Sequence, residues 1–150
     1  MRTILFAATI LACINASQSQ AAVSLQPGEW QTTETGTENG QPTKPQIEKD
    51  CMTAEEARDA TNLVKQMKAE MQEQGSKCEK FDVQQSGESV TFAMKCVMGQ
   101  QFLIDMTGTF TLLSSTKYVG AIKTSVKMGT IDSASDKKVE AIRIGECKAH

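Results

Sequence analysis

The chain has 150 residues, of which 39% are hydrophobic and 5% aromatic, so it is long enough for one ordinary domain with a modest core. Sixteen Lys and Arg residues against 18 Asp and Glu give a formal net charge of -2 without a basic tail or arginine cluster, which argues against nucleic-acid binding. The single histidine is His150, so Ser-His-Asp, Cys-His and multi-histidine metal sites would lack their central group.

The first residues have the pattern of a secretory signal peptide. Arg2 supplies a positive charge, residues 4–14 are apolar, and residues 15–21 are small and polar. The apolar run is too short for a transmembrane helix, so we expect cleavage after Ala21 and one domain over residues 22–150, with no membrane span. The alternative is a lipoprotein, because residues 10–13 loosely resemble a bacterial acylation site and would anchor the protein through Cys13.

The cysteines predict two disulfides in an oxidising compartment outside the cytosol. Removing residues 1–21 from 150 leaves 129 residues and four cysteines, Cys51, Cys78, Cys96 and Cys147. No C-x-x-C pair, which would indicate a redox motif or a zinc site, occurs among them.

The N-terminal part of the predicted domain favours a β-hairpin. Residues 29–35 are rich in threonine and include the only tryptophan, Trp30. Asn39-Gly40 suits a tight hairpin turn, after which residues 43–51 return as a partner strand. Pro42 and Pro45 remove backbone donors and favour an edge position for that strand.

One helix is expected between Thr53 and Gly75. Thr53 and Glu56 form the pattern of a capping box, and apolar residues then recur at spacings of three and four. The apolar stripe is rich in Ala and Met, which suits a helix that lies across a sheet. It comprises Ala57, Ala60, Leu63, Val64, Met67 and Met71.

After Cys78 the hydrophobic period changes from 3.6 to 2, which indicates strands. The expected extended segments are residues 80–85, 89–98, 101–113, 118–128 and 139–147. Alternate apolar positions predict that one face of the sheet is buried (the dry face). Threonines and charged residues, including Arg143, are expected on the opposite, solvent-exposed face (the wet face). The expected inward residues are Val90, Phe92, Met94, Cys96 and Met98; Phe102, Ile104, Met106, Phe110 and Leu112; Tyr118, Ile122, Val126 and Met128; and Ile142 and Ile144.

Together these elements predict an α+β fold: a curved antiparallel β-meander of about six strands packed against one α-helix and linked by two disulfides.

The chain resembles the DUF3617 family, a domain of unknown function in exported proteobacterial proteins. The resemblance spans residues 27–147. It is carried by Pro27-Gly28-Glu29-Trp30, Cys51-Met52-Thr53-Ala54-Glu55-Glu56-Ala57, Cys78, Ser86-Gly87 with Val90-Thr91-Phe92 and Cys96, Gly108-Thr109-Phe110, Tyr118-Val119-Gly120 and Ile144-Gly145-Glu146-Cys147. The resemblance implies a periplasmic setting and no particular reaction.

Two connectivities of the cysteines remain open. Cys78 and Cys96 bracket a hairpin centred near Gly87, which favours Cys78–Cys96 with Cys51–Cys147. Cys78 and Cys96 have opposite parity in that hairpin, however, so this pairing needs a β-bulge. The competing set is Cys51–Cys78, across the helix, with Cys96–Cys147.

No catalytic or metal-binding motif stands out. The methionines invite a Cu(I) site, but most occupy expected core positions. Residues 132–136 could be read as a calcium loop but lack the ligand pattern, which favours a solvated turn. Neighbouring carboxylates such as Glu55 and Glu56 lie on the polar side of the helix. We therefore expect no cofactor and no metal.

Binding is the function that remains. We expect a non-enzymatic, monomeric periplasmic module that binds an unknown envelope protein or supports the envelope. The alternatives are a carrier of a small hydrophobic or lipid ligand, held between sheet and helix, and an enzyme that uses a buried carboxylate or Tyr118. The candidate ligand-facing or core residues are Phe92, Met94, Phe102, Ile104, Met106, Phe110 and Tyr118.

Overall fold

The computed structural model describes residues 24–99 and 101–148. The predicted signal peptide with its cleavage site at Ala21, the alternative lipidation site Cys13 and the histidine His150 lie outside the described residues.

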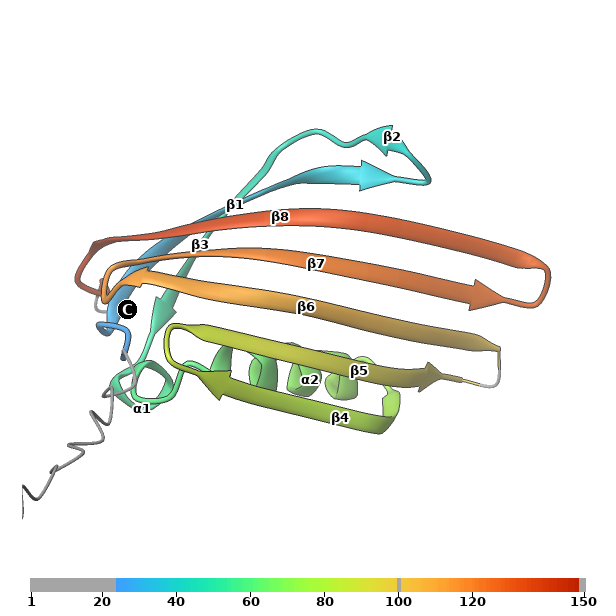
Figure 1. Ribbon diagram of the computed structural model, residues 1–150, viewed down its shortest axis with the longest axis horizontal. Coiled ribbons are helices and arrows are strands. Elements are labelled where there is room, and N and C mark those ends of the chain that lie inside the picture. The colour runs from blue at the N-terminus through green and yellow to red at the C-terminus, as the bar shows by residue number, and fades with distance from the viewer. Residues whose placement is uncertain (1–23, 100, 149–150) are drawn as a thin grey trace, which may run out of the picture.

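The described residues form eight strands and two short helices (Figure 1). In chain order these are β1 (Gly28–Glu38), β2 (Gln41–Pro42), β3 (Gln46–Met52), α1 (Ala54–Ala57), α2 (Asn62–Glu73), β4 (Ser76–Ser86), β5 (Ser89–Met98), β6 (Phe102–Ser114), β7 (Lys117–Met128) and β8 (Ile131–Gly145).

All eight strands belong to one antiparallel sheet in the order β2-β1-β8-β7-β6-β5-β4, and β3 pairs with β1 on the same side as β2. Strands β4 to β8 are a continuous meander, and β1 closes onto β8. The predicted antiparallel meander is confirmed. The expected number of about six strands is wrong, partly because the return after the Asn39-Gly40 turn is split into β2 and β3, with Pro45 between them.

Strand β8 begins earlier than predicted. Residues 132–136, expected as a solvated turn, lie within β8, and the turn falls at Gly129 and Thr130 instead. Their Ser, Ala and Asp side chains have little intrinsic preference for strands. Tertiary pairing outweighs that preference: β7 pairs on one side, and on the other Asn39 donates its backbone N–H to the Ala134 carbonyl and accepts from the Ala134 N–H through its side chain.

The inward residues of β8 are Val139 and Ala141, which are buried. The prediction of Ile142 and Ile144 is wrong: these side chains are 40% and 44% exposed. Ala141 lies opposite Tyr118, so alternation turns Ile142 outward. The same alternation turns Arg143 inward, opposite the buried Trp30, so its prediction on the wet face is wrong. The register of β1 against β8 shifts only after this pair, between Trp30 and Glu29.

The single predicted helix is wrong, because the segment is divided into α1 and α2. The capping box is confirmed: Glu56 N–H donates to Thr53 Oγ1 at 3.3 Å, and Thr53 N–H donates to the Glu56 carboxylate at 2.6 Å. Asp59 then accepts bonds from the backbone N–H of Thr61 at 2.9 Å and from its hydroxyl at 2.6 Å. These local bonds favour a turn over a continuous helix. Gly75, with φ of 89°, ends α2 as expected.

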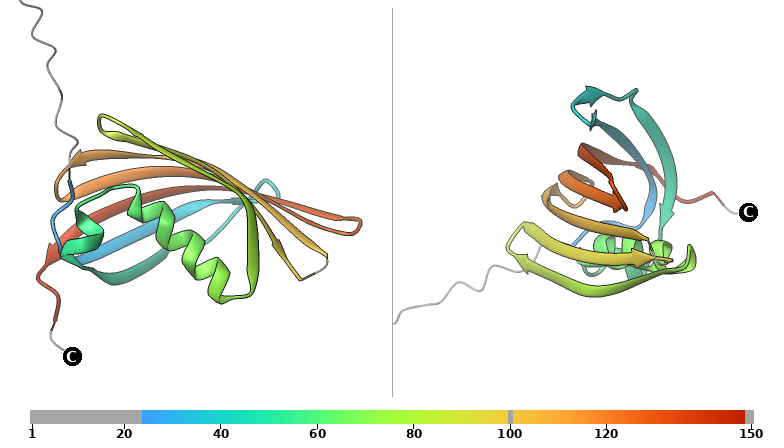
Figure 2. Two further views of the ribbon diagram at one scale, coloured as in Figure 1. Left: turned by 90° about the horizontal axis from the view of Figure 1, so that it is seen from below. Right: turned by 90° about the vertical axis from the view of Figure 1, so that its right-hand side faces the viewer.

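The sheet is strongly curved, and α2 lies across its concave, inner face (Figure 2). Helix α2 contacts β4 in particular, at one side of the sheet. Within the described ranges, no helix combines the length and the apolar composition needed to cross a bilayer.

Two disulfides join Cys51 to Cys147 and Cys78 to Cys96, the pairing favoured above. The register of β4 against β5 shifts between Cys78 and Lys80, so Glu79 is an extra residue in β4. This bulge brings Cys78 to the face of Cys96 and removes the conflict of parity.

Candidate functional site

The inner face of the sheet consists of rows of side chains that cross from strand to strand. The register places Phe92, Gly108, Ile122 and Lys137 in one such row. On one side of this row the face is filled by packed side chains, which we call the packed half. On the other side of this row the inner face continues beyond the residues that pack against the helices. We call this second part of the inner face the open half.

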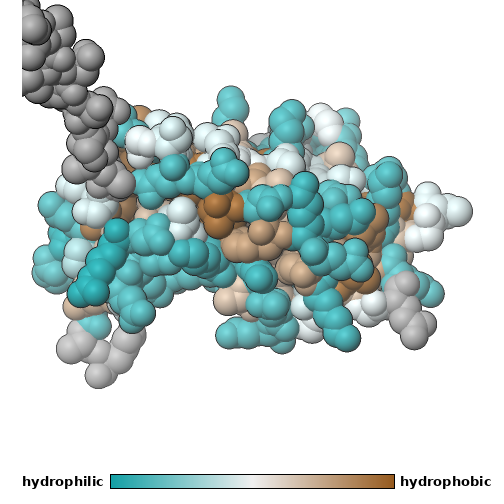
Figure 3. Space-filling view, turned by 60° about the horizontal axis from the view of Figure 1, so that its bottom comes forward, coloured by the Kyte–Doolittle hydropathy of each residue, from teal (hydrophilic) through white to brown (hydrophobic). Residues whose placement is uncertain are grey.

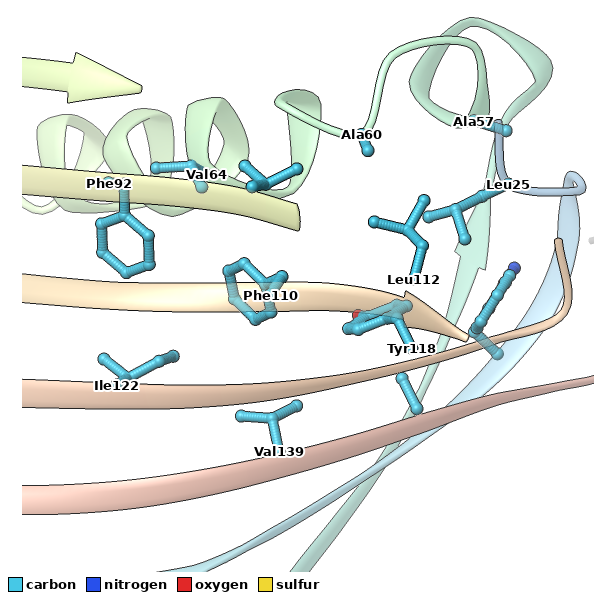
Figure 4. Packing of buried hydrophobic residues seen from close by; sticks show 13 residues of the cluster. Leu25, Ala57, Ala60, Val64, Phe92, Phe110, Leu112, Tyr118, Ile122 and Val139 are labelled. Atoms are coloured by element: carbon cyan, nitrogen blue, oxygen red, sulfur yellow. The ribbon is translucent and has the colours of Figure 1, made fainter. Parts of the chain in front are cut away.

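The packed half is organised by four aromatic rings. Phe92 stacks on Phe110 with 5.9 Å between ring centroids. Phe110 meets Tyr118 edge to face at 5.8 Å, and Tyr118 lies 5.5 Å from Trp30. Figure 4 shows this cluster between the sheet and the helices, with Val64 and Ala60 above it. Because the buried rings fill the space under the helices, this half is a core rather than a cavity.

Two glycines make room for these rings. A Cβ atom on Gly120 would lie 2.5 Å from Cδ1 of Phe110, and one on Gly108 would lie 2.6 Å from Cε1 of Phe92. Each ring therefore lies over a glycine of the neighbouring strand, which brings aromatic surface close to the backbone.

The open half comprises three rows at the far ends of β5, β6, β7 and β8. The first continues from Met94 through Met106 and Thr124 to Ser135 and Glu38; the second runs from Cys96 through Ile104 and Val126 to Ser133; the third runs from Met98 through Phe102 and Met128 to Ile131. Phe102 is 39% and Ile131 58% exposed, whereas the aromatic residues of the packed half are buried. Seen from below, the molecule shows apolar surface in its middle and toward its right-hand end, between polar groups (Figure 3).

One hydroxyl next to these rows lacks a partner. Ser76 lies opposite Met98 at the β4 end of the third row and is only 4% exposed. Its Oγ has no hydrogen-bond partner among the described residues. A buried hydroxyl without a partner costs free energy, so its position in this row is unusual.

The strands on the opposite side of the inner face carry acidic side chains. Glu34 and Glu38 of β1 share the face of Trp30, and the register places Glu48 and Asp50 of β3 on the same face. We call these four residues the acidic wall. Glu34 pairs with Lys137 at 2.7 Å; the ion pairs of the described residues include none of the other three carboxylates.

The acidic wall affects Tyr118. Burial raises the pKa of the Tyr118 hydroxyl, and the carboxylates of Asp50 and Glu34 raise it further, whereas a hydrogen bond with Thr32 opposes the rise. The tyrosine is therefore neutral at ordinary pH and is packed between Trp30 and Phe110. Its environment is that of a core residue rather than a catalytic acid or base.

Small hollows lie beside the acidic wall. One of about 220 Å³ is lined by residues of β1, β7 and β8, including Thr124, Ser133 and Glu38. Another of about 180 Å³ is lined by Glu34, Lys44 and Lys137 among others. Both have polar linings, so polar space borders the apolar rows.

The largest hollow that we describe, about 670 Å³, lies on the other, outer face of the sheet. Its lining side chains alternate with the core residues and include Thr33, Thr109, Val119, Ala121 and Glu140. Several of them are exposed, and Glu140 is bound to Lys117 at 3.1 Å. The lining is therefore made of short, ordinary surface residues, without a buried polar group to orient a small ligand.

Metal ligands do not gather in the part of the chain that the structure describes: no three His, Cys, Asp or Glu side chains form a cluster suited to an ion. The methionines weighed for Cu(I) occupy inner-face or helix positions. Met94 lies opposite Met106 across β5 and β6, and Met94 is buried.

All seven predicted site residues share the inner face, but they divide between its two halves. Phe92, Phe110 and Tyr118 belong to the packed half. Met94 is buried where the open half begins, Met106 is partly buried beside it, and Ile104 and Phe102 follow in the next two rows. Sequence reasoning missed the acidic wall, although the even spacing of Glu34 and Glu38, and of Glu48 and Asp50, in the predicted hairpin was a usable signal.

These features define a class of protein: disulfide-linked α+β proteins built on one curved antiparallel sheet that encloses a short helix. The family model described as "Protein of unknown function (DUF3617)" matches residues 25–147, and the chain belongs to this family. Neither the curated proteins nor the solved structures that were searched contain a match to the chain.

Proposed function

We propose that the protein is a non-enzymatic binding module of the bacterial periplasm, and that the open half of its inner face holds a small ligand with an apolar body. The observation that carries this proposal is the continuation of apolar rows beyond the packed half, with Phe102 exposed on the inner face. Apolar surface that is concave and bordered by polar groups is characteristic of ligand sites.

The periplasmic location rests on the sequence and on the cross-links. Two disulfides in a small domain suit an oxidising compartment. The mass of the protein purified from the periplasm tests the route: export with cleavage predicts an N-terminus at Ala22, whereas a lipid-modified Cys13 supports the lipoprotein alternative.

Methionine supports the choice of an apolar ligand. Met98, Met106 and Met128 lie in the rows of the open half, and Met67 of α2 packs against the core nearby. Methionine is flexible and polarizable, so a surface rich in it adapts to ligands of different shapes.

A titration with N-phenyl-1-naphthylamine, a neutral apolar fluorescent probe, tests the proposal. The variants Phe102→Ser and Met106→Gln should each weaken binding about tenfold, because each removes apolar contact area worth about 1.4 kcal/mol. Ile142→Ser is the matched control: Ile142 has an exposure similar to that of Phe102 but lies on the outer face, and its variant should bind like the parent.

Native mass spectrometry of the periplasmic protein supplies the second measurement. We expect a co-purifying small molecule in the parent and its loss in Met106→Gln. The proposal is wrong if the probe binds no more tightly than to an unrelated domain, or if Ile142→Ser weakens it as much as Phe102→Ser does.

A second candidate is the binding of an envelope protein on the outer face. It is favoured by the 670 Å³ hollow on that face, together with the exposed Ile142. In affinity capture from envelope extracts, this function requires a partner that Ala121→Arg loses and Phe102→Ser retains. This second function is excluded if no captured protein is both lost with Ala121→Arg and retained with Phe102→Ser.

A further inference from the structure

We propose that the ligand of the open half is an uncharged amphiphile, whose small hydroxyl-bearing head lies against β7 and β8 and whose apolar body lies on β5 and β6. This inference rests on the proposed function and adds the chemical class of the ligand's head group. It follows from a boundary between apolar and hydroxyl side chains that crosses the open half.

The boundary arises because β7 and β8 change character along the inner face. In the packed half they contribute Ile122 and Val139, which are buried. Farther along the same face they contribute hydroxyl side chains: Thr124 from β7, and Ser135 and Ser133 from β8. A core gains nothing from hydroxyls at these positions, since each one has to be paired or solvated. The two strands therefore present hydrogen-bonding groups beyond the part of the sheet that packs against the helices.

Strands β5 and β6 stay apolar over the same rows. In the first row Met106 of β6 lies opposite Thr124 of β7. In the second row Val126 lies between Ile104 and Ser133. Paired side chains on neighbouring strands have Cβ atoms about 5 Å apart. One small molecule can therefore contact apolar and hydroxyl side chains at the same time.

The hydroxyl side chains also line one hollow. The inner-face hollow of about 220 Å³ is bordered by Thr124, Ser133 and Ser135, together with Glu38. Water occupies about 30 Å³ per molecule in the liquid, so a head of roughly six heavy atoms, such as a glycerol group, fits this space. The hollow thus places room for a head group beside the apolar rows.

The three hydroxyls are available to such a head. Their residues are partly buried, and the side-chain hydrogen bonds found among the described residues include none from Thr124, Ser133 or Ser135. A hydroxyl both donates and accepts, so a head with two hydroxyls can pair with these groups in either direction. It can also donate to the carboxylate of Glu38, which borders the same hollow.

The charges of the open half do not favour an ion. Glu38 is the one charged side chain among the described residues of the three rows, and it is exposed. Lys137 also lines the hollow, but it is bound to Glu34 at 2.7 Å. A single exposed carboxylate attracts a cation only weakly in water, and it repels an anion. A head that forms hydrogen bonds without carrying charge therefore matches this lining best.

The experiment compares four probes that share a ten-carbon chain and differ in the head. 1-Decanoylglycerol and methyl decanoate are both uncharged, but only the first carries hydroxyls; decanoate and decyltrimethylammonium supply the two charges. Each competes with N-phenyl-1-naphthylamine on the full mature protein at pH 7.5, below its micelle concentration.

We expect 1-decanoylglycerol to bind about tenfold more tightly than methyl decanoate, a difference of about 1.4 kcal/mol, and more tightly than either ion. Because methyl decanoate is the more apolar of the two uncharged probes, hydrophobicity alone would give the opposite order. Raising the salt concentration should leave the preference between these two probes unchanged, since neither has a charge to be screened.

The triple variant Thr124→Val, Ser133→Ala, Ser135→Ala should bind 1-decanoylglycerol and methyl decanoate within about threefold of each other, because the head group loses its partners. Methyl decanoate should bind at least as tightly as it does to the parent, since its apolar contacts are kept. Circular dichroism and a urea titration check that the variant folds.

The matched control is the triple variant Thr107→Val, Ser89→Ala, Ser125→Ala. It removes the same hydroxyls from the outer face, where Thr107 lies opposite Lys123 and Ser125 lies opposite Asp105. This variant should keep the parent's preference for 1-decanoylglycerol.

The outcomes separate this inference from the proposed function. Methyl decanoate or an ion that binds as tightly as 1-decanoylglycerol, or a preference that survives the inner triple variant, overturns the inference and leaves the apolar site standing. If none of the four probes competes and Phe102→Ser has no effect, the proposed function itself is overturned.

Discussion

At the scale of single residues, the contact between Gly120 and Phe110 shows how the sheet brings an aromatic core close to its own backbone. The ring of Phe110 occupies the volume that a side chain at position 120 would need. The same relation holds between Gly108 and Phe92. In each pair the glycine lies directly opposite the aromatic residue in the register.

Gly120→Ala should therefore destabilise the protein by about 1–3 kcal/mol, the usual cost of overpacking. The new Cβ would stand 2.5 Å from Cδ1 of Phe110, so the ring has to move. Urea titration measures the loss. Gly145→Ala is the matched control, since no atom lies within 4 Å of a Cβ built there, and it should change stability little. A Gly120 variant as stable as the Gly145 variant would contradict the packing described for Phe110.

At the scale of elements, the break between α1 and α2 positions the helical segment on the sheet. Ala57, the last residue of α1, and Ala60, in the turn between α1 and α2, are both buried. Leu25 N–H donates to the Ala57 carbonyl at 3.0 Å, which ties the chain before β1 to α1. The turn built by Asp59 therefore lets two short helices follow the curved inner face where one straight helix would not.

The turn predicts a dependence of stability on pH. Hydrogen bonds from Thr61, followed by the bond and charge of Lys65, lower the pKa of Asp59 from 3.8 to about 2. A carboxylate with a lowered pKa in the folded state stabilises the protein above pH 3.8, and this contribution is lost as the pH falls toward 2.

Asp59→Asn should therefore be less stable than the parent at pH 6, by about 0.5–1 kcal/mol because the carboxylate is half exposed, and the two should converge by pH 2. Urea titrations at several pH values measure the difference. Thr61→Val removes the hydroxyl that donates to Asp59. Its free energy of unfolding should likewise be lower than that of the parent at pH 6 and approach it by pH 2. A difference that is constant across this range would show that the Asp59 charge does not contribute.

The sequence predicted those elements whose signals are local. The capping box at Thr53, the Asn39-Gly40 turn and the end of α2 at Gly75 depend on a few adjacent residues, and all three are confirmed. The failures depend on distant contacts. Residues 132–136 are extended because β7 and β1 pair with them, and Ile142 faces outward because the register is set by Tyr118 and Ala141. Local preference contains no information about such pairing.

At the scale of the whole molecule, the same limit applies to the candidate site. Alternation placed Phe92, Phe102 and Met106 on one face, but could not tell which rows the helices would cover. That division depends on where α2 crosses the sheet. The acidic wall was missed because its four carboxylates share the inner face only once β1 has paired with both β3 and β8.

The Cys51–Cys147 disulfide should make a large contribution to global stability. It closes a loop with a sequence separation of 96 residues, whereas the Cys78–Cys96 loop spans 18. In the chain-entropy model, loops of these lengths contribute about 4.7 and 3 kcal/mol.

Cys51→Ser with Cys147→Ser should lower the free energy of unfolding by about 4–5 kcal/mol, chiefly by freeing the unfolded chain. Urea titration should then also show a steeper dependence on denaturant, because the unfolded state exposes more surface. The control is the parent protein under the same non-reducing conditions. A loss below about 1 kcal/mol, with an unchanged slope, would show that this bridge does not constrain the unfolded chain.

The pairing of the first strand with the last has a consequence for biosynthesis. A ribosome makes β1 before any other strand, yet its partner β8 is completed last. One edge of β1 therefore remains unpaired while the meander from β4 to β8 forms hairpin by hairpin. The threonine-rich sequence of β1 is suited to this delay, since a polar strand without a partner is less prone to aggregate. In the same way, Cys51 has no disulfide partner until Cys147 has been made, whereas Cys78 and Cys96 are joined by one hairpin and can form their disulfide earlier.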